Sequence, residues 1–133
     1  MKIFAVFLVA FGFGVSNAQA ADWRLVGQSN TAYAYVDLSS IVKLKATRKA
    51  WIMWTDIEEV SKTSGPRSSK VLMHFNCTER SSARAQFTMY AGFEGQGETI
   101  ASSKYPIVAS SFDEVIPDTV GEQIFIFVCG KNL

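Results

Sequence analysis

Apolar and polar residues alternate with a period of two in several segments of the chain, a pattern typical of half-buried β-strands. Five longer segments show it, at 22–28, 31–37, 50–60, 69–80 and 83–93, and a shorter one follows at 98–106. Polar or glycine-rich turns separate them, for example Ser29-Asn30, Gly65-Pro66 and residues 94–97. Short connections of this kind predict an antiparallel meander of about six strands.

The alternation also predicts which side chains share a face. In segment 50–60 the residues Trp51, Met53, Thr55 and Ile57 fall on one face, which we expect to be the core face. Trp54 then lies on the opposite, outer face. In segment 83–93 the same reasoning places Ala85, Phe87, Met89 and Ala91 inside and Tyr90 outside.

The last segment changes period. Thr119 and Glu122 fit a capping box at the start of a helix. Apolar residues then recur at helical spacing, at positions 120, 124, 127 and 128, and Gly130 is a plausible stop. We therefore expect a C-terminal helix, although the β-rich run 124–129 leaves a strand as the alternative. The expected fold class is α+β, an antiparallel sheet of about six strands packed against a C-terminal α-helix, with one disulfide.

The first twenty residues resemble a secretory signal peptide. Lys2 precedes an apolar run of 13 residues, and Ala18-Gln19-Ala20 forms a small-x-small cleavage site. The run is shorter than the roughly 20 residues of a membrane-spanning helix, so a retained anchor is the weaker alternative. We predict cleavage after Ala20 and a single mature domain, 21–133, without stable membrane insertion. No cysteine lies near the cut, so we expect no lipid anchor there and a periplasmic or secreted location.

Export to an oxidising compartment decides how the two cysteines are interpreted. Two cysteines in a small secreted domain most often form one disulfide, which predicts the pair Cys77–Cys129. A catalytic Cys–His pair is the alternative, because His74 lies three positions before Cys77. An odd spacing on a strand points the two side chains to opposite faces. A metal site would need further converging ligands, and the sequence shows no such spacing.

Charge bears on the class of partner. Removing Lys2 with the signal peptide leaves equal numbers of basic and acidic residues, and a near-neutral domain argues against nucleic acid. Residues 43–49 form a basic run, expected to be an exposed loop, that could bind an acidic partner. The alternative is a solvated loop that keeps the protein in solution. Adding the aromatic residues expected on outer faces, the candidate partner-binding residues are Lys43, Lys45, Arg48, Lys49, Trp54 and Tyr90. An exposed sheet edge or face could also support a homodimer.

Motifs of catalysis occur only in fragments. Ser40-Ile-Val-Lys43 matches an S-x-x-K pattern but lacks its companion motifs. Glu58 and Glu59 are adjacent and point to opposite faces of a strand. The glycines at 92, 95 and 97 lack the strand-then-helix context of a phosphate loop. We therefore expect no enzymatic activity, catalytic residue, metal site or cofactor.

The order of short segments along the chain resembles the bacterial surface-adhesin protein E family. The segments that carry the resemblance are Trp23-x-Leu-Val, Tyr-x-Asp-Leu-Ser-Ser-Ile at 35–41, Arg48-Lys-x-Trp51, Ser-Ser-Lys-Val-Leu at 68–72, Phe-Asn-Cys77, Tyr90 with Gly92, Val-Ile-Pro117 and Cys129. The resemblance implies a small antiparallel sheet with a C-terminal helix and one disulfide. It also implies adhesion to host extracellular-matrix or serum proteins, often by an outer-membrane lipoprotein.

Two functional hypotheses follow. In the first, the chain is an exported binding protein that contacts a protein partner through the basic loop and exposed aromatic side chains. In the second, it is a periplasmic protein that binds a small apolar ligand between sheet and helix, or at a dimer interface, with no role in adhesion.

Overall fold

The computed structural model describes residues 20–61 and 64–133, so the predicted signal peptide lies outside the described residues except for Ala20. In these ranges the chain forms eight strands and one α-helix. The strands are β1 Trp23–Gln28, β2 Ala32–Asp37, β3 Val42–Lys43, β4 Arg48–Asp56, β5 Ser68–Asn76, β6 Ser81–Tyr90, β7 Thr99–Lys104 and β8 Asp113–Glu114, and the helix is α1 Val120–Cys129.

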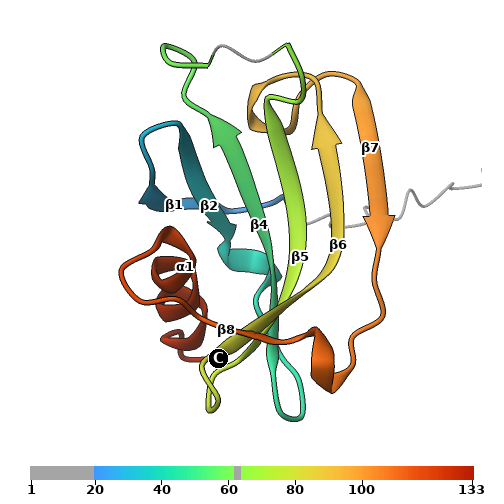
Figure 1. Cartoon of the computed structure of the whole chain (residues 1–133). Helices are drawn as coiled ribbons and strands as arrows, with labels where there is room; N and C mark the ends of the chain where they lie inside the picture. Colours follow the sequence, from blue (N-terminus) through green and yellow to red (C-terminus); the bar gives the residue numbers. More distant parts are fainter. Residues whose placement is uncertain (1–19, 62–63) are drawn as a thin grey trace, which may run out of the picture.

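The strands form one antiparallel sheet (Figure 1). Six of them lie in the order β1-β2-β4-β5-β6-β7, with β3 paired to β4 and β8 paired to β6. The meander of about six strands is therefore confirmed. The two-residue strands β3 and β8 add to it, and the sequence pattern did not predict them because two residues carry no period.

The helix α1 packs against one face of the sheet (Figure 1). The Thr119 hydroxyl accepts a hydrogen bond of 3.2 Å from the Glu122 N–H, and the Glu122 carboxylate accepts one from the Asp118 N–H. These bonds satisfy backbone donors that a helix start leaves unpaired. The C-terminal helix is confirmed, and the alternative of a strand at 124–129 is wrong.

The core lies between α1 and the left half of the sheet as drawn in Figure 1. Side chains from β2, β4 and β5 pack together with side chains of the helix. The buried cluster consists of Ala34, Val36, Ile41, Ala50, Ile52, Phe75, Ile124, Phe125 and Val128. Burial of apolar surface of this kind supplies the main favourable term in folding.

The expected orientation of β4 is wrong. Ala50 and Ile52 lie in the buried cluster and Trp54 packs against it, so these three residues face α1. Trp51 and Met53 consequently point to the other side. Both faces of β4 are apolar, because the helix covers one and a loop covers part of the other. Alternation alone could therefore not decide which face is the core.

A bulge in β6 changes the faces of that strand as well. Leu72 of β5 pairs with Gln86 and the next residue, Met73, pairs with Arg84, so Ala85 has no partner on β5. Arg84 therefore shares the helix-side face with Phe87, although the regular alternation predicted opposite faces. A bulge inserts one extra residue and shifts the phase of all residues beyond it.

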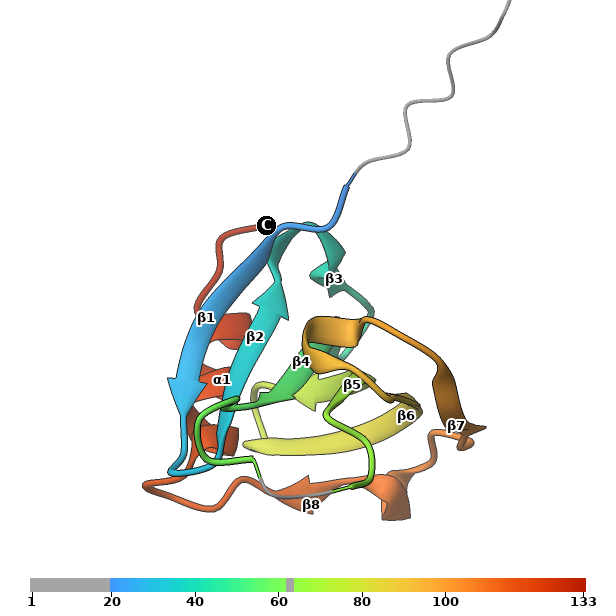
Figure 2. The ribbon, with the colours of Figure 1, turned by 90° about the horizontal axis from the view of Figure 1, so that it is seen from above.

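The face of the sheet away from α1 carries the loop after β6 (Figure 2). The loop contains a 3-10 turn, Phe93–Gly95 (η2), where a tight turn at 94–97 was predicted. The Ser68 hydroxyl donates to the Gly92 carbonyl at 2.6 Å and accepts from the Gly95 N–H at 2.8 Å. Gly95 has a φ of 72°, in the region that favours glycine.

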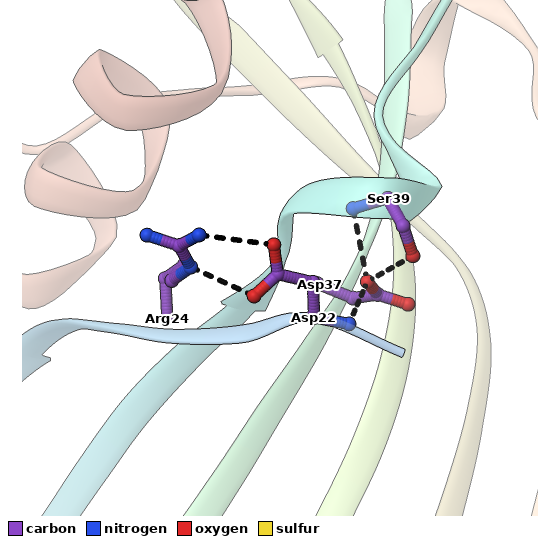
Figure 3. A network of polar contacts seen from close by, with 4 residues as sticks. All are labelled: Asp22, Arg24, Asp37 and Ser39. Atoms are coloured by element: carbon purple, nitrogen blue, oxygen red, sulfur yellow. Dashed lines mark hydrogen bonds and ion pairs between the residues drawn. The ribbon is translucent and has the colours of Figure 1, made fainter. Parts of the chain in front are cut away.

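The start of β1 is tied to the end of β2 by a carboxylate (Figure 3). One oxygen of Asp37 accepts hydrogen bonds from the Ser39 N–H, the Ser39 hydroxyl and the Asp22 N–H, at 3.0, 2.6 and 2.9 Å. Asp37 thereby caps the 3-10 turn Leu38–Ser40 that follows β2. Arg24 forms an exposed ion pair with Asp22, which lowers the pKa of the Asp22 carboxyl.

Candidate functional site

The basic run 43–49 includes the turn that joins β3 to β4. This β3–β4 hairpin lies at the lower end of the sheet in Figure 1. The hairpin is closed by a hydrogen bond of 2.8 Å from the Leu44 N–H to the Thr47 carbonyl. Lys43 and Lys45 are exposed on it. We call residues 42–49 the basic hairpin. The prediction of an exposed loop is correct for its tip only, since β4 already begins at Arg48.

Arg48 is half-buried and contacts the C-terminal end of α1, so it is not an exposed cation of the hairpin. Its guanidinium donates to the carbonyl of Val128 at 2.9 Å and to that of Lys131 at 2.6 Å. The last carbonyls of a helix lack partners within it and carry partial negative charge, so a cation stabilises them. Its expected role in binding a partner competes with these contacts. The sequence separation of about eighty residues gives no signal for this contact.

Lys49 lies within β4 and is half-buried, where an exposed position was expected. It pairs across the strands with His74 of β5, so the two side chains share a face. Burial lowers the pKa of His74, and the positive charge of Lys49 lowers it further. The histidine is therefore held in its neutral form near neutral pH.

The predicted disulfide between Cys77 and Cys129 is confirmed, with their Cα atoms 5.7 Å apart. It joins the turn after β5 to the last residue of α1. A shallow hollow of about 260 Å³ lies between this disulfide and the basic hairpin; its lining is Lys43–Arg48, Cys77 and Thr78. The base of the hairpin is thus held by the Arg48 contacts and lies beside the disulfide.

The two aromatic candidates lie on opposite faces of the sheet. Trp54 is on the helix side, which corrects its expected outward position. Tyr90 is on the other side as expected, where its ring and that of Trp23 lie 5.5 and 5.6 Å from the Lys70 ammonium group. Trp54 and Tyr90 therefore do not form one patch. No pattern along the chain indicated that the Lys70 ammonium group lies near two aromatic rings.

His74 and Cys77 do not form a chemical pair. His74 lies between Met73, which packs against the core, and the buried Phe75, so it points to the opposite face, while Cys77 is bound in the disulfide. Within residues 20–61 and 64–133, no group of three or more histidine, cysteine or carboxylate side chains is placed to hold a metal ion.

Comparison with known proteins decides the family. The sequence profile of the family described as "Surface-adhesin protein E" matches residues 23–130, which is nearly the whole described chain. The chain belongs to the surface-adhesin protein E family. No curated protein sequence matches it significantly.

Solved structures of Haemophilus influenzae protein E share the fold of this chain. A second crystal form of Haemophilus influenzae protein E superposes with a TM-score of 0.57 at 20% identity, covering 88% of this chain and 97% of that one. Another structure of Haemophilus influenzae protein E superposes with a TM-score of 0.56 at 18% identity, covering 86% of this chain and 87% of that one. Protein E from non-typeable Haemophilus influenzae superposes with a TM-score of 0.54 at 19% identity, covering 86% of this chain and 80% of that one.

The adhesin E fold of this chain has one α-helix among the described residues, and that helix is too short to cross a membrane.

Proposed function

We propose that this member of the surface-adhesin protein E family is an exported, non-enzymatic protein whose basic hairpin binds an acidic surface on a protein partner. Family membership supports adhesion as the general role, and the signal-peptide pattern of residues 1–20 supports export to the periplasm or the medium. As the resemblance implies, the expected partners are host extracellular-matrix or serum proteins.

The observation that carries the proposal is that the basic hairpin is held in a fixed position on the fold. Lys45 is exposed at its tip and Lys43 is exposed on β3, and its base is held by Arg48 and lies beside the disulfide. A pre-organised loop loses less conformational entropy on binding than a mobile one. The two lysines therefore present their charges to a partner from a fixed position.

Charge at this position favours an acidic partner. Lys131, just beyond α1, places its ammonium group 4.2 Å from the centre of the Phe127 ring, and its carbonyl accepts a hydrogen bond from Arg48 at the base of the hairpin. Complementary charges across an interface raise the association rate and select the partner. We expect the complex to weaken as salt is added, because exposed charges are screened.

The test is surface plasmon resonance of the mature domain against a panel of matrix and serum glycoproteins. The variant is Lys43→Glu/Lys45→Glu, which leaves the structural residue Arg48 in place. We expect the reversal to weaken binding by at least about tenfold, or about 1.4 kcal/mol.

The matched control is Lys104→Glu, an exposed lysine at the end of β7, which β5 and β6 separate from β4. Its binding should equal that of the wild type. Equal binding by all three proteins would remove the basic hairpin from the proposal, and no binding to any glycoprotein of the panel would count against adhesion.

A further inference from the structure

The helix covers only part of its face of the sheet. α1 packs on β1, β2 and the neighbouring parts of β4 and β5, whereas β6 and β7 lie beyond it (Figures 1 and 2). On the uncovered part, apolar side chains of the helix-side face are only half-buried, including Trp54, Met73, Phe87 and Met89. The connection from β7 to α1 passes over this region and carries β8.

A hollow of about 420 Å³ opens between α1, β8 and this part of the sheet. Most of its wall is apolar, from Trp54, Val71, Met73, Phe75, Val115, Ile116 and Ile124. A volume in this range and a mainly apolar lining with few polar groups are typical of pockets for small ligands. We call it the helix-side pocket.

Two polar side chains of the helix-side pocket, Ser82 and Arg84, lie together on β6. Ser82 and Arg84 are two residues apart on β6, so their side chains point the same way. Both, together with Met73, also line a neighbouring hollow of about 490 Å³ toward Tyr105 and Asp113. The hydroxyl and the guanidinium therefore mark the place where the pocket opens outward.

Arg84 is available to a ligand. Its guanidinium lies 5.9 Å from the centre of the Phe87 ring, and no carboxylate of the described residues forms an ion pair with it. A guanidinium presents parallel donors that match the two oxygens of a carboxylate. Two acidic side chains of β8 oppose a negative head group, Glu114 on the pocket wall and Asp113 on the neighbouring hollow.

We propose that the helix-side pocket binds a single-chain amphiphile with a carboxylate head group, such as a free fatty acid. The alkyl chain lies against Trp54, Met73 and Ile124, and the carboxylate accepts hydrogen bonds from Arg84 and Ser82 at the open end. None of the residues that line this pocket belongs to the basic hairpin. The pocket therefore adds a second activity that does not depend on the proposed binding of a protein partner.

Gly121 offers a way to close the pocket without harming the fold. It lines the pocket from the first turn of α1, and a Cβ built there meets only the Thr119 hydroxyl, at an ordinary 3.5 Å. Glycine is also a poor helix former. Gly121→Leu should therefore fill the pocket with a side chain and raise the melting temperature.

The experiment is isothermal titration calorimetry, with native mass spectrometry for stoichiometry, on the mature domain. The probes share a twelve-carbon chain and differ in charge: dodecanoate, dodecyl maltoside and dodecyltrimethylammonium, each below its micelle concentration. We expect one dodecanoate per chain, bound more tightly than the neutral probe, and the cationic probe bound most weakly. Gly121→Leu should abolish binding of dodecanoate while remaining folded.

The charge variants test the orientation of the ligand. Arg84→Gln should lower the affinity for dodecanoate by about tenfold and leave the affinity for dodecyl maltoside unchanged. Glu114→Gln should raise the affinity for dodecanoate. The proposal is overturned if dodecanoate does not bind, if folded Gly121→Leu binds it as the wild type does, or if the cationic probe binds most tightly. Lys43→Glu/Lys45→Glu should bind dodecanoate normally, which separates this site from the basic hairpin.

Discussion

Replacing Arg48 should destabilise the fold, although the sequence pattern groups it with the exposed lysines of the basic hairpin. Arg48→Met keeps most of the aliphatic stem and removes two hydrogen bonds, of 2.9 Å to the Val128 carbonyl in the last turn of α1 and of 2.6 Å to the Lys131 carbonyl just beyond it. A hydrogen bond to a charged group contributes about 1.5–3 kcal/mol, and the charge at a helix C-terminus adds about 0.3–1 kcal/mol. Because Arg48 is half-buried and water can replace part of each bond, we expect a total loss of about 2–3 kcal/mol.

Urea denaturation followed by circular dichroism measures this loss as a change in the midpoint at constant slope. Arg48→Lys keeps the charge but not the planar pair of donors, so it should recover about half of the stability. Lys45→Met, at the exposed tip, should change the free energy of unfolding by less than about 0.5 kcal/mol. If Arg48→Met were as stable as Lys45→Met, the contacts with α1 would contribute nothing, and Arg48 would return to the set of candidate binding residues.

Three further predictions concern the disulfide, the histidine and the helix start. The variant Cys77→Ser/Cys129→Ser should lose about 4 kcal/mol on the chain-entropy model for a closed loop with a separation of 52; a loss below about 1 kcal/mol in urea denaturation would reject that magnitude. Because the folded pKa of His74 is lowered, its contribution is fully present above the unfolded pKa of about 6.5 and is lost as pH falls toward the folded pKa. Wild-type stability should therefore fall more steeply than that of His74→Gln as the pH drops below about 6.5, and parallel curves would contradict this. Thr119→Ala should cost about 1 kcal/mol in thermal unfolding while Thr119→Ser stays close to wild type, since only the hydroxyl accepts the helix-capping bond; equal losses would show that the cap is not the cause.

Local patterns predicted the elements of this fold well. The helix start was visible because Thr119 and Glu122 stand at a fixed spacing, and the capping bonds form within four residues of the chain. The disulfide followed from a count of two cysteines and an export signal. Both inferences depend on short-range geometry or on composition, which the sequence shows directly.

Orientation and long-range contacts were not predictable in the same way. The two faces of β4 are both apolar, so the outward placement of Trp54 was wrong, and the bulge at Ala85 moved Arg84 to the helix side. Nothing in residues 43–49 separates Arg48 from its basic neighbours, because its partners are the carbonyls of Val128 and Lys131. A site for an apolar ligand between sheet and helix was one of the two hypotheses, but its lining could not be predicted, since the walls of the helix-side pocket come from four strands, a helix and a connection.

The central claim, that the basic hairpin binds an acidic protein partner, is tested most directly by one side-by-side measurement. The dissociation constants of wild type, Lys45→Glu and Lys104→Glu are determined for the same immobilised glycoprotein at low and at high salt. The account predicts equal values for wild type and Lys104→Glu, and an affinity about tenfold lower for Lys45→Glu at low salt that approaches the others at roughly 1 M salt, where charges are screened within about 3 Å. Equal affinity of Lys45→Glu and Lys104→Glu at low salt would contradict it.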